Sequence, residues 1–235
     1  MDHAEIRSSF FSLSTPLIAD ACVRLSLPLR IAPPGIQLVT PGVRLAGRVL
    51  PAKHSGSVDI FLEAIEASSP GDVLVIDNDG RVDEGCIGDL TVLEAQAAGL
   101  AGIIVWGCHR DSTELAQIRF PVFSYGRCPA GPTRQESRRS DALQTVHVGD
   151  LEIDRNDVVF ADDDGILFVA HSHMDVVLTT AKAISQTERR QAEGIRSGTS
   201  LRQQLHFEEY LEKRANDSSF TFRKHLRKLG GAIEE

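Results

Sequence analysis

The sequence has no long apolar run. None of its hydrophobic stretches approaches the roughly 20 residues that a membrane-spanning helix needs. The first ten residues, MDHAEIRSSF, carry acidic side chains where a secretory signal peptide would carry basic ones followed by an apolar stretch. These absences predict a cytoplasmic protein without a membrane partner.

An excess of basic residues is also missing. The chain has 25 Lys and Arg residues against 33 Asp and Glu residues, so its formal net charge at pH 7 is −8. Proteins that bind nucleic acid or an anionic membrane surface present a clustered basic face. The composition therefore argues against a nucleic-acid partner and favours a small molecule or another protein.

Cysteine is scarce and widely spaced. The four cysteines, at positions 22, 86, 108 and 128, form no Cys-x-x-Cys pair, which argues against a structural zinc site and suits free thiols in a reducing compartment. Cys108 and His109 are adjacent and could suggest a thiol or soft-metal site. Two neighbouring residues cannot easily chelate one ion, so the favoured interpretation is that Cys108 packs in the core.

A chain of 235 residues with 42% hydrophobic content is long enough for one good-sized core, or for a domain with an appended helical arm. Apolar spacing predicts a helix over residues 16–25, followed by a proline-rich linker. A strand is expected in VRLAGRVLPA (43–52). The next helix is expected within residues 56–71, with Ser57 as its N-cap and four inward residues, Ile60, Phe61, Ala64 and Ile65.

The clearest unit is a βαβ pattern. DVLVID (72–77) and GIIVWG (102–107) are apolar runs without polar alternation, which is typical of strands buried on both faces. Residues 88–102 between them predict a helix, and its spacing predicts that Leu90, Leu93, Ala97 and Leu100 cover the sheet. FPVFSYG (120–126) predicts a further strand.

The rest of the chain changes character twice. Residues 133–141 are polar and predict a loop, and residues 144–172 predict short strands separated by turns. From Met174 the pattern is helical, with Val177, Leu178, Ala181 and Ile184 on one face. We therefore expect an α/β domain over residues 1–185 and a C-terminal helical arm over residues 186–235, which packs on a neighbouring subunit.

Polar residues follow both strands of the βαβ unit. The first run ends in Asp77-Asn78-Asp79-Gly80, the helix begins at GCIGDL (85–90), and the second run ends in GCHRD (107–111). In parallel sheets, ligands bind beyond the carboxyl ends of the strands, where helix N-termini present free N–H groups. The topology therefore predicts that Arg110 and Asp111 lie at the mouth of a crevice.

The chemistry of these residues suits a small carboxylate. The amides of residues 86–89 favour an anion, and Arg110 can hold a carboxylate through two parallel hydrogen bonds. Asp111 could hold a hard divalent cation such as Mg²⁺, which together with these groups suits a 2-oxo acid. On spacing alone, a solvated Arg110–Asp111 surface pair remains the favoured alternative, and Asp89 could be only a helix cap.

Two further segments allow more than one interpretation. Lys53-His54-Ser55-Gly56 could line the crevice or be structural, with equal weight on each. Asp162-Asp163-Asp164 could bind Ca²⁺ but is more simply a tight turn into the strand ILFVA.

Taken together, the motifs resemble a known family. They are Gly-Asp-Leu at a helix start, Gly-x-x-Arg-Asp after the next strand, Phe-Pro-Val-Phe, and FADDDGILFVA, with STPLIADACVRL and PGDVLVIDNDG fitting as well. This set, which spans roughly residues 14–200, is similar to the regulators of ribonuclease activity A and the 4-hydroxy-4-methyl-2-oxoglutarate aldolases. Each motif alone is weak, but the set is specific.

The resemblance implies a metal-dependent class II pyruvate aldolase, often also an oxaloacetate decarboxylase. It implies a β/β/α swivelling-type fold, assembled as a homotrimer or homohexamer, with Mg²⁺ (or Mn²⁺) as cofactor and a 2-oxo acid as substrate. No Schiff-base lysine is needed. The alternative function within the same family is that of a non-enzymatic regulator that binds a protein.

The resemblance also assigns roles to individual residues. Asp111 matches the metal-binding aspartate, Arg110 the arginine that holds the substrate and stabilises the enolate, and Asp89 the aspartate that orients a water for proton transfer. The amides of Cys86, Ile87, Gly88 and Asp89 match the loop that binds the pyruvyl carboxylate. A glutamate from the C-terminal region of an adjoining subunit, here Glu188 or Glu193, would complete the site. Segment 133–141 departs from the family, because none of its arginines aligns with the basic residue commonly found there.

Overall fold

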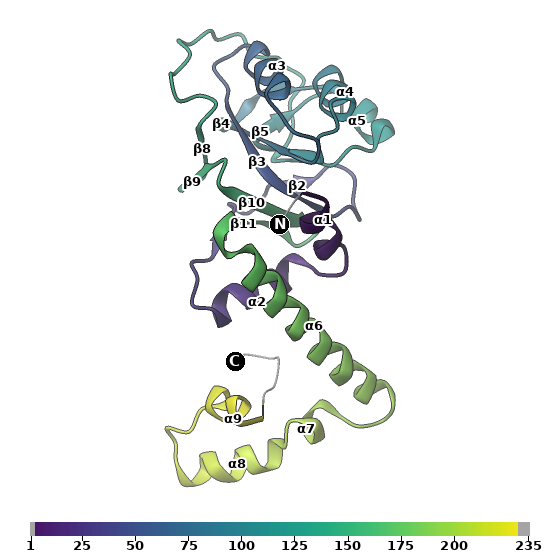
Figure 1. Cartoon of the computed structure of the whole chain (residues 1–235), viewed down its shortest axis with the longest axis vertical. Coiled ribbons are helices and arrows are strands. Elements are labelled where there is room, and N and C mark those ends of the chain that lie inside the picture. The colour runs from purple at the N-terminus through teal and green to yellow at the C-terminus, as the bar shows by residue number, and fades with distance from the viewer. Residues whose placement is uncertain (1–2, 230–235) are drawn as a thin grey trace.

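The structure is a computed structural model that describes residues 3–229. Strands and helices alternate through most of the chain, and helices alone make up the part after residue 170 (Figure 1). The strands are β1 (Arg30–Ile31), β2 (Gln37–Leu38), β3 (Leu45–Lys53), β4 (Val73–Ile87), β5 (Gly102–His109), β6 (Val122–Ser124), β7 (Gly126–Arg127), β8 (Thr145–Val148), β9 (Leu151–Asp154), β10 (Asp157–Asp162) and β11 (Gly165–Ala170). The helices are α1 (His3–Phe11), α2 (Thr15–Arg24), α3 (Asp59–Glu66), α4 (Asp89–Ala97), α5 (Ser112–Ile118), α6 (Met174–Arg196), α7 (Leu201–Gln204), α8 (Phe207–Asn216) and α9 (Phe222–Leu229), with a 3-10 turn at His171–His173.

Within the described residues, one nine-stranded mixed sheet organises the fold, in the order β1-β11-β10-β3-β4-β5-β6-β2, with β7 paired to β5. Strands β3, β4, β5 and β6 are parallel, whereas β10, β11 and β1 add antiparallel pairs at one side. The predicted βαβ unit is therefore confirmed as the centre of the sheet. A separate two-stranded hairpin is formed by β8 and β9.

The proline-rich linker has more structure than its composition predicts. Its two short strands pair at opposite edges of the sheet, β1 with β11 and β2 with β6. The linker therefore crosses the sheet from one edge to the other. Proline at positions 33 and 34, between the two strands, keeps this crossing out of helix.

Strand β4 is much longer than the predicted run at residues 72–77. It pairs regularly with β5 from Val73 to Asp77, and then only at Arg81, Gly85 and Ile87, with a register shift before each of them. The irregular part contains Asp79 and Gly80, both with positive φ angles. Such bulges re-aim side chains next to functional sites, and here they separate the apolar half of β4 from its polar half.

Three buried clusters fill the molecule. One lies between α3, α4, α5 and the parallel strands, a second between α1, α2, α6 and strands β3, β10 and β11, and the third covers the opposite face of the central strands. Because neighbouring strand residues such as Val75 and Ile76 belong to different clusters, the central strands are buried on both faces, as predicted.

The predicted inner face of α4 is wrong. Leu90 and Leu93 are 75% and 44% exposed, whereas Thr91, Val92 and Ala95 face the core. Leu100 is buried, but it lies beyond the end of the helix. The spacing of the leucines alone predicts the wrong face, because Thr91, Val92 and Ala95 form a second stripe at three- and four-residue steps, and this second stripe is the buried one.

The predicted N-cap of α3 is also wrong. Val58 occupies the N-cap position and the helix begins at Asp59, so Ser57 lies one residue before the cap. The four predicted inward residues of this helix are all buried, as expected. The helix predicted over residues 16–25 is confirmed as α2, and the predicted inner face of α6 agrees with the structure as well, since Val177, Leu178, Ala181 and Ile184 are all buried.

The triple aspartate forms a tight turn, as predicted. Asp162 ends β10, Gly165 begins β11, and the two strands pair as an antiparallel hairpin. The Asp162 carboxylate accepts hydrogen bonds from the Thr15 amide (2.8 Å) and hydroxyl (2.6 Å) at the start of α2. Its role in this structure is therefore to hold α2 against the sheet.

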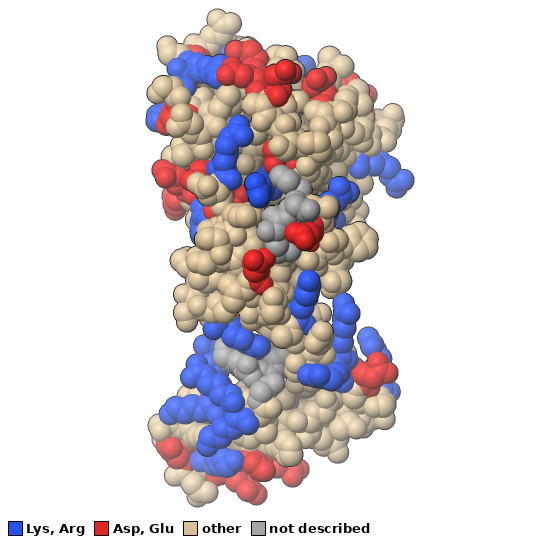
Figure 2. Space-filling model, in the orientation of Figure 1, with Lys and Arg blue, Asp and Glu red and all other residues tan. Residues whose placement is uncertain are grey.

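The C-terminal helices extend away from the sheet (Figure 1). Helix α6 runs without interruption from the core to Arg196, and α7, α8 and α9 follow as a group with its own aromatic contacts. Tyr210, Leu205 and Leu226 are buried there, and the His225 ring bonds the Leu205 carbonyl at 2.7 Å. Lys and Arg side chains are numerous on this lower part of the molecule (Figure 2).

The last residues of the predicted arm, 230–235, lie outside the described residues. Among residues 3–229, no helix is long and apolar enough to span a membrane.

The orientation of α4 gives a stability test. Truncating Val92 to alanine removes two buried carbons and is expected to lower the free energy of unfolding by about 2 kcal/mol. Leu90→Ala should change it by less than about 0.5 kcal/mol, because that side chain is exposed in the monomer. Urea denaturation of both variants measures the difference, and a larger loss for Leu90→Ala at low protein concentration would contradict this orientation.

Candidate functional site

The predicted crevice residues lie where β4 and β5 end side by side. Ile87 and His109 are paired in the parallel register, and the Arg110 amide donates to the Ile87 carbonyl at 2.9 Å. Helix α4 begins two residues after Ile87, and α5 begins three residues after His109. The chain reversals that follow both strands therefore face each other at one edge of the sheet.

The structure brings together the three residues with predicted chemical roles. The Asp89 amide lies 3.3 Å from Asp111 Oδ2, and Arg110 Nε lies 3.5 Å from the same oxygen. The Arg110 and Asp111 side chains are 49% and 34% exposed. An ion pair this open to water contributes only about 0–1 kcal/mol, so both groups stay accessible to a ligand at little cost.

Gly88 permits this close approach. A Cβ atom at position 88 would lie 2.1 Å from Asp111 Oδ2 and 3.2 Å from Arg110 Nε. Asp111 itself adopts a left-handed conformation (φ 58°), which an L-residue adopts only at some cost and aspartate tolerates better than most. The local backbone is thus specialised to place the Asp111 carboxylate over the start of α4.

The predicted anion-binding loop is shorter than expected. Cys86 and Ile87 still belong to β4 and are buried, so only Gly88 and Asp89 lie at the turn into α4. The Asp89 carboxylate accepts a hydrogen bond from the Leu90 amide at 2.8 Å. The predicted alternative of a helix cap is wrong for Asp89, because Gly88 occupies the N-cap position and Asp89 is the first residue of α4; its negative charge in the first turn still favours the helix.

His109, the last residue of β5, connects this strand to β6 and to the start of α5. Its Nδ1 lies 2.6 Å from the Ser124 hydroxyl and its Nε2 lies 3.0 Å from the Ser112 hydroxyl. Burial lowers the pKa of this imidazole, and the Arg127 charge lowers it further. A neutral ring satisfied at both nitrogens holds β5, β6 and α5 together.

Cys108 is a core residue, as favoured from the sequence. It and Cys86 are buried free thiols, and burial raises the pKa of both. No group of three or more His, Cys, Asp or Glu side chains able to hold a metal ion occurs among residues 3–229.

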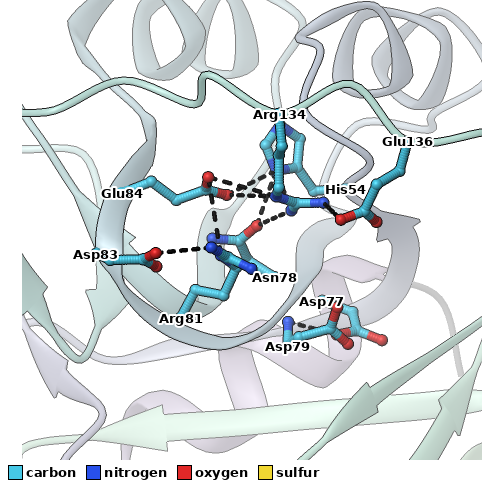
Figure 3. Close-up of polar contacts among 9 residues, drawn as sticks. All are labelled: His54, Asp77, Asn78, Asp79, Arg81, Asp83, Glu84, Arg134 and Glu136. Atoms are coloured by element: carbon cyan, nitrogen blue, oxygen red, sulfur yellow. Dashed lines mark hydrogen bonds and ion pairs between the residues drawn. The ribbon is translucent and has the colours of Figure 1, made fainter.

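A buried polar network lies beside this edge of the sheet (Figure 3), and the sequence did not reveal it. Asn78 Oδ1 bonds His54 Nδ1 and Arg134 Nη2, both at 2.8 Å. Arg134 Nε lies 3.1 and 3.3 Å from the two Glu84 oxygens, and Arg134 Nη1 lies 2.8 Å from Glu136. Burial is the main cause of the lowered pKa of His54, and the Arg134 charge adds to it.

This network settles the position of two segments that the sequence left open. Segment 53–56 contributes His54 to the network rather than to the Asp111 edge, and Lys53 pairs with Asp77 at 3.3 Å. In segment 133–141, Arg134 joins the network, Arg138 pairs with Glu63, and Arg139 bonds Asp141 at 2.9 Å. To predict the network, one would have to know that Glu84 pairs with Arg134, which lies 50 residues later. The spacing of residues along the sequence does not indicate such a distant pairing.

The fold is that of an α/β protein with a mixed central sheet, and the candidate site lies at the ends of two of its parallel strands. The Aldolase/RraA family model matches residues 15–168. The chain belongs to the RraA-like family.

Individual relatives agree with this membership. A protein from Alkalilimnicola ehrlichii named "Putative 4-hydroxy-4-methyl-2-oxoglutarate aldolase" is 31% identical over 153 residues, covering 65% of this chain and 94% of that protein. Legionella pneumophila protein DlpA is 28% identical over 172 residues, covering 72% of this chain but only 27% of its own length. The chain therefore spans about a quarter of DlpA.

Solved structures share the fold. A protein from Pseudomonas syringae pv. tomato superposes with a TM-score of 0.72 at 27% identity, covering 83% of this chain and 94% of that one. Streptomyces coelicolor RraAS2, described as an unusual member of the RNase ES inhibitor RraA protein family, gives a TM-score of 0.70 at 26% identity, covering 80% and 96%.

Two of the buried histidines, His54 and His109, predict a pH dependence of stability. Both have a lowered pKa in the folded protein, so the unfolded chain binds protons more readily around pH 6.5, the ordinary value. The stabilisation is complete above that value and is lost as the pH falls below it. Urea denaturation between pH 7.5 and 5.5 should show a falling free energy of unfolding. The fall should be shallower in His109→Gln but unchanged in the exposed control His173→Gln, and equal slopes in all three proteins would refute this origin.

Proposed function

We propose that this protein is a divalent-metal-dependent lyase that cleaves or decarboxylates a 2-oxo acid and releases pyruvate. The observation that carries the proposal is the convergence of Asp89, Arg110 and Asp111 at the ends of β4 and β5. Membership of the RraA-like family, whose relatives include proteins named as aldolases, supports the same reaction class.

Arg110 would hold the substrate. Within the part of the chain that the structure describes, its recorded ionic contact is the 3.5 Å approach of Nε to Asp111. The terminal nitrogens are therefore free to form two parallel hydrogen bonds with a carboxylate or with a carboxylate and a keto oxygen. As carbon–carbon cleavage proceeds, the guanidinium would stabilise the negative charge that develops on the keto oxygen.

The donor set at this edge fits Mg²⁺ (or Mn²⁺). Asp111 offers a partly exposed carboxylate, a hard oxygen ligand, and Mg²⁺ is commonly held by one or two carboxylates together with water and substrate. Of the thiols near this edge, Cys86 and Cys108 are buried in the core, and Cys128 lies half-buried beside the end of β5. When bound, the ion would supply Lewis-acid stabilisation of the reacting oxygen.

Asp89 would serve proton transfer. Its backbone amide lies 3.3 Å from Asp111 at the start of α4, so its carboxylate begins from the same turn as the proposed ion ligand. A carboxylate in such a place can hold a water and pass a proton to or from it. The bound water, rather than a lysine, would then deliver the proton to the product carbon.

A homotrimer or homohexamer would complete the site. Leu90 directly follows Asp89 and, with Leu93, forms an exposed apolar stripe on α4. Exposed apolar side chains beside a polar site are typical of a protein interface. Helix α6 carries Glu188 and Glu193, the two candidates for reaching the site of an adjoining subunit, and the C-terminal helical arm after residue 185 would pack on that subunit.

The enzyme proposal is tested by pyruvate release from oxaloacetate, with Mg²⁺ and with EDTA. Wild type should lose activity in EDTA, and Asp111→Ala should be inactive in both. Arg110→Ala should lose on the order of 10²–10³ in kcat, as for removal of one oxyanion donor. Arg155→Ala and Asp163→Ala, both exposed and elsewhere in the fold, are matched controls that should keep wild-type rates.

Equal pyruvate release from wild type, Asp111→Ala and Arg110→Ala would rule out this lyase. The alternative is a regulator that acts by binding a protein, which the description of RraAS2 as a member of an RNase inhibitor family favours. That function predicts a stable complex with a protein partner that survives EDTA and both substitutions.

The assembly proposal is tested by light scattering after size-exclusion chromatography. Leu90→Glu combined with Leu93→Glu places two charges in the proposed interface and should convert the oligomer to monomers. Val23→Glu, at a similarly exposed apolar position on α2, should leave the mass unchanged. A wild-type protein that is already monomeric at micromolar concentration would refute the proposed interface.

A further inference from the structure

We infer that segment 128–136 positions the substrate-binding groups, and that Arg134 is the positioning residue that fixes this segment. The inference rests on the proposed function for its effect on catalysis. Its structural part, that Arg134 restrains the ends of β4 and β5, stands independently of the reaction.

The segment begins by pairing with both strand ends that form the site. The Cys128 amide donates to the His109 carbonyl at 2.8 Å, and the Gly85 amide donates to the Ala130 carbonyl at 2.8 Å. A Cβ atom at position 85 would lie 2.6 Å from the Cys128 carbonyl oxygen. The segment is therefore in direct backbone contact with the residues that lead into Gly88 and Arg110.

The segment then passes against the Arg110 guanidinium. A Cβ atom at Gly131 would lie 2.9 Å from Arg110 Nη1. Side chains at this position would push the guanidinium aside, so the path of the backbone here limits where Arg110 can point. A shift of this segment would consequently move the group that is proposed to hold the substrate carboxylate.

Arg134 attaches the segment to β4. Its side chain is 14% exposed, and Nε contacts both oxygens of Glu84, whose side chain is 6% exposed. Figure 3 shows the contact between Arg134 and Glu84. Glu84 directly precedes Gly85, so the ion pair acts on the same part of β4 that the Ala130 carbonyl contacts. Arg134 Nη2 also bonds Asn78 Oδ1 at 2.8 Å, which links the segment to the bulged part of β4.

The remaining attachments involve the backbone. The Glu136 amide donates to the Ser55 carbonyl at 2.9 Å, and a Cβ atom at Gly56 would lie 2.0 Å from the Arg134 carbonyl oxygen. Arg138 and Arg139, in contrast, make ion pairs only with exposed acids. Arg134 is thus the one arginine of segment 133–141 whose side chain can transmit the position of the segment to the site.

The first test is local hydrogen exchange measured by mass spectrometry on the full-length protein. Arg134→Gln should accelerate exchange at least tenfold in peptides covering residues 85–90 and 109–112, and leave the β10–β11 hairpin unchanged. Arg138→Gln, from the same segment, is the matched control and should match wild type throughout. If exchange in the site peptides is the same in both variants, the inference is wrong, whatever the activity of the wild type.

The second test is kinetic and separates positioning from general damage. Arg134→Gln should lower kcat/KM for oxaloacetate by a factor on the order of 10², as for a misplacement of about 1 Å, with the melting temperature measured alongside. Arg134→Lys keeps one charge but loses the bidentate fork, so its kcat/KM should fall between those of Arg134→Gln and wild type. If Arg134→Gln does not fold, wild-type kinetics and wild-type exchange in Arg134→Lys would overturn the inference. Absence of activity in wild type would instead refute the proposed function and leave the exchange test intact.

Discussion

The close backbone approach between the ends of β4 and β5 is the constraint on which the site depends. The Arg110 amide bonds the Ile87 carbonyl, and the missing side chain at Gly88 leaves room for the Asp111 carboxylate. Both strands lie in the centre of a sheet buried on two faces, so their ends cannot drift independently. The packing of the buried parts of β4 and β5 thus fixes the backbone positions of Arg110 and Asp111. The ion pair between these two side chains is too weak to do so.

A second constraint on the ends of β4 and β5 is the buried ion pair between Glu84 and Arg134. The irregular half of β4 does not pair continuously with β5, and it carries a buried carboxylate, Glu84, that needs a cation. Arg134 pairs with it from a segment without regular secondary structure, and Arg81 Nε lies 3.8 Å from its other oxygen. Breaking a buried ion pair by removing one partner is costly, because the other charge stays buried. The ion pair consequently attaches the polar segment 133–141 to β4, although that segment has no strand or helix of its own up to Ser140.

The parts of the fold that the sequence predicted correctly depend on local periodicity. The apolar runs of β4 and β5 and the inner face of α6 follow from the spacing of apolar residues within a few positions. The hairpin at residues 162–165 follows from turn-forming residues that are adjacent in the sequence. The inner face of α4 was predicted wrongly because that helix carries two apolar stripes, and a single chain does not reveal that one of them is left exposed. The sequence underestimates the length of β4, because Asn78-Asp79-Gly80 are residue types that usually end a strand. In the structure Asp79 and Gly80 adopt positive φ angles, and the strand continues beyond them.

The same distinction explains what was predicted of the site. Asp89, Arg110 and Asp111 follow predicted strands and helix starts, so the topology of parallel strands was enough to place them together. His54, Glu84 and Arg134 meet through tertiary contacts between segments 30 to 80 residues apart, and no local pattern marks such a meeting. Residues proposed to touch the ligand thus sit at positions that secondary structure dictates, whereas those proposed to hold them in place come from the packing of distant segments. A search for function in this fold should therefore begin at the strand ends and continue to the buried charges directly behind them.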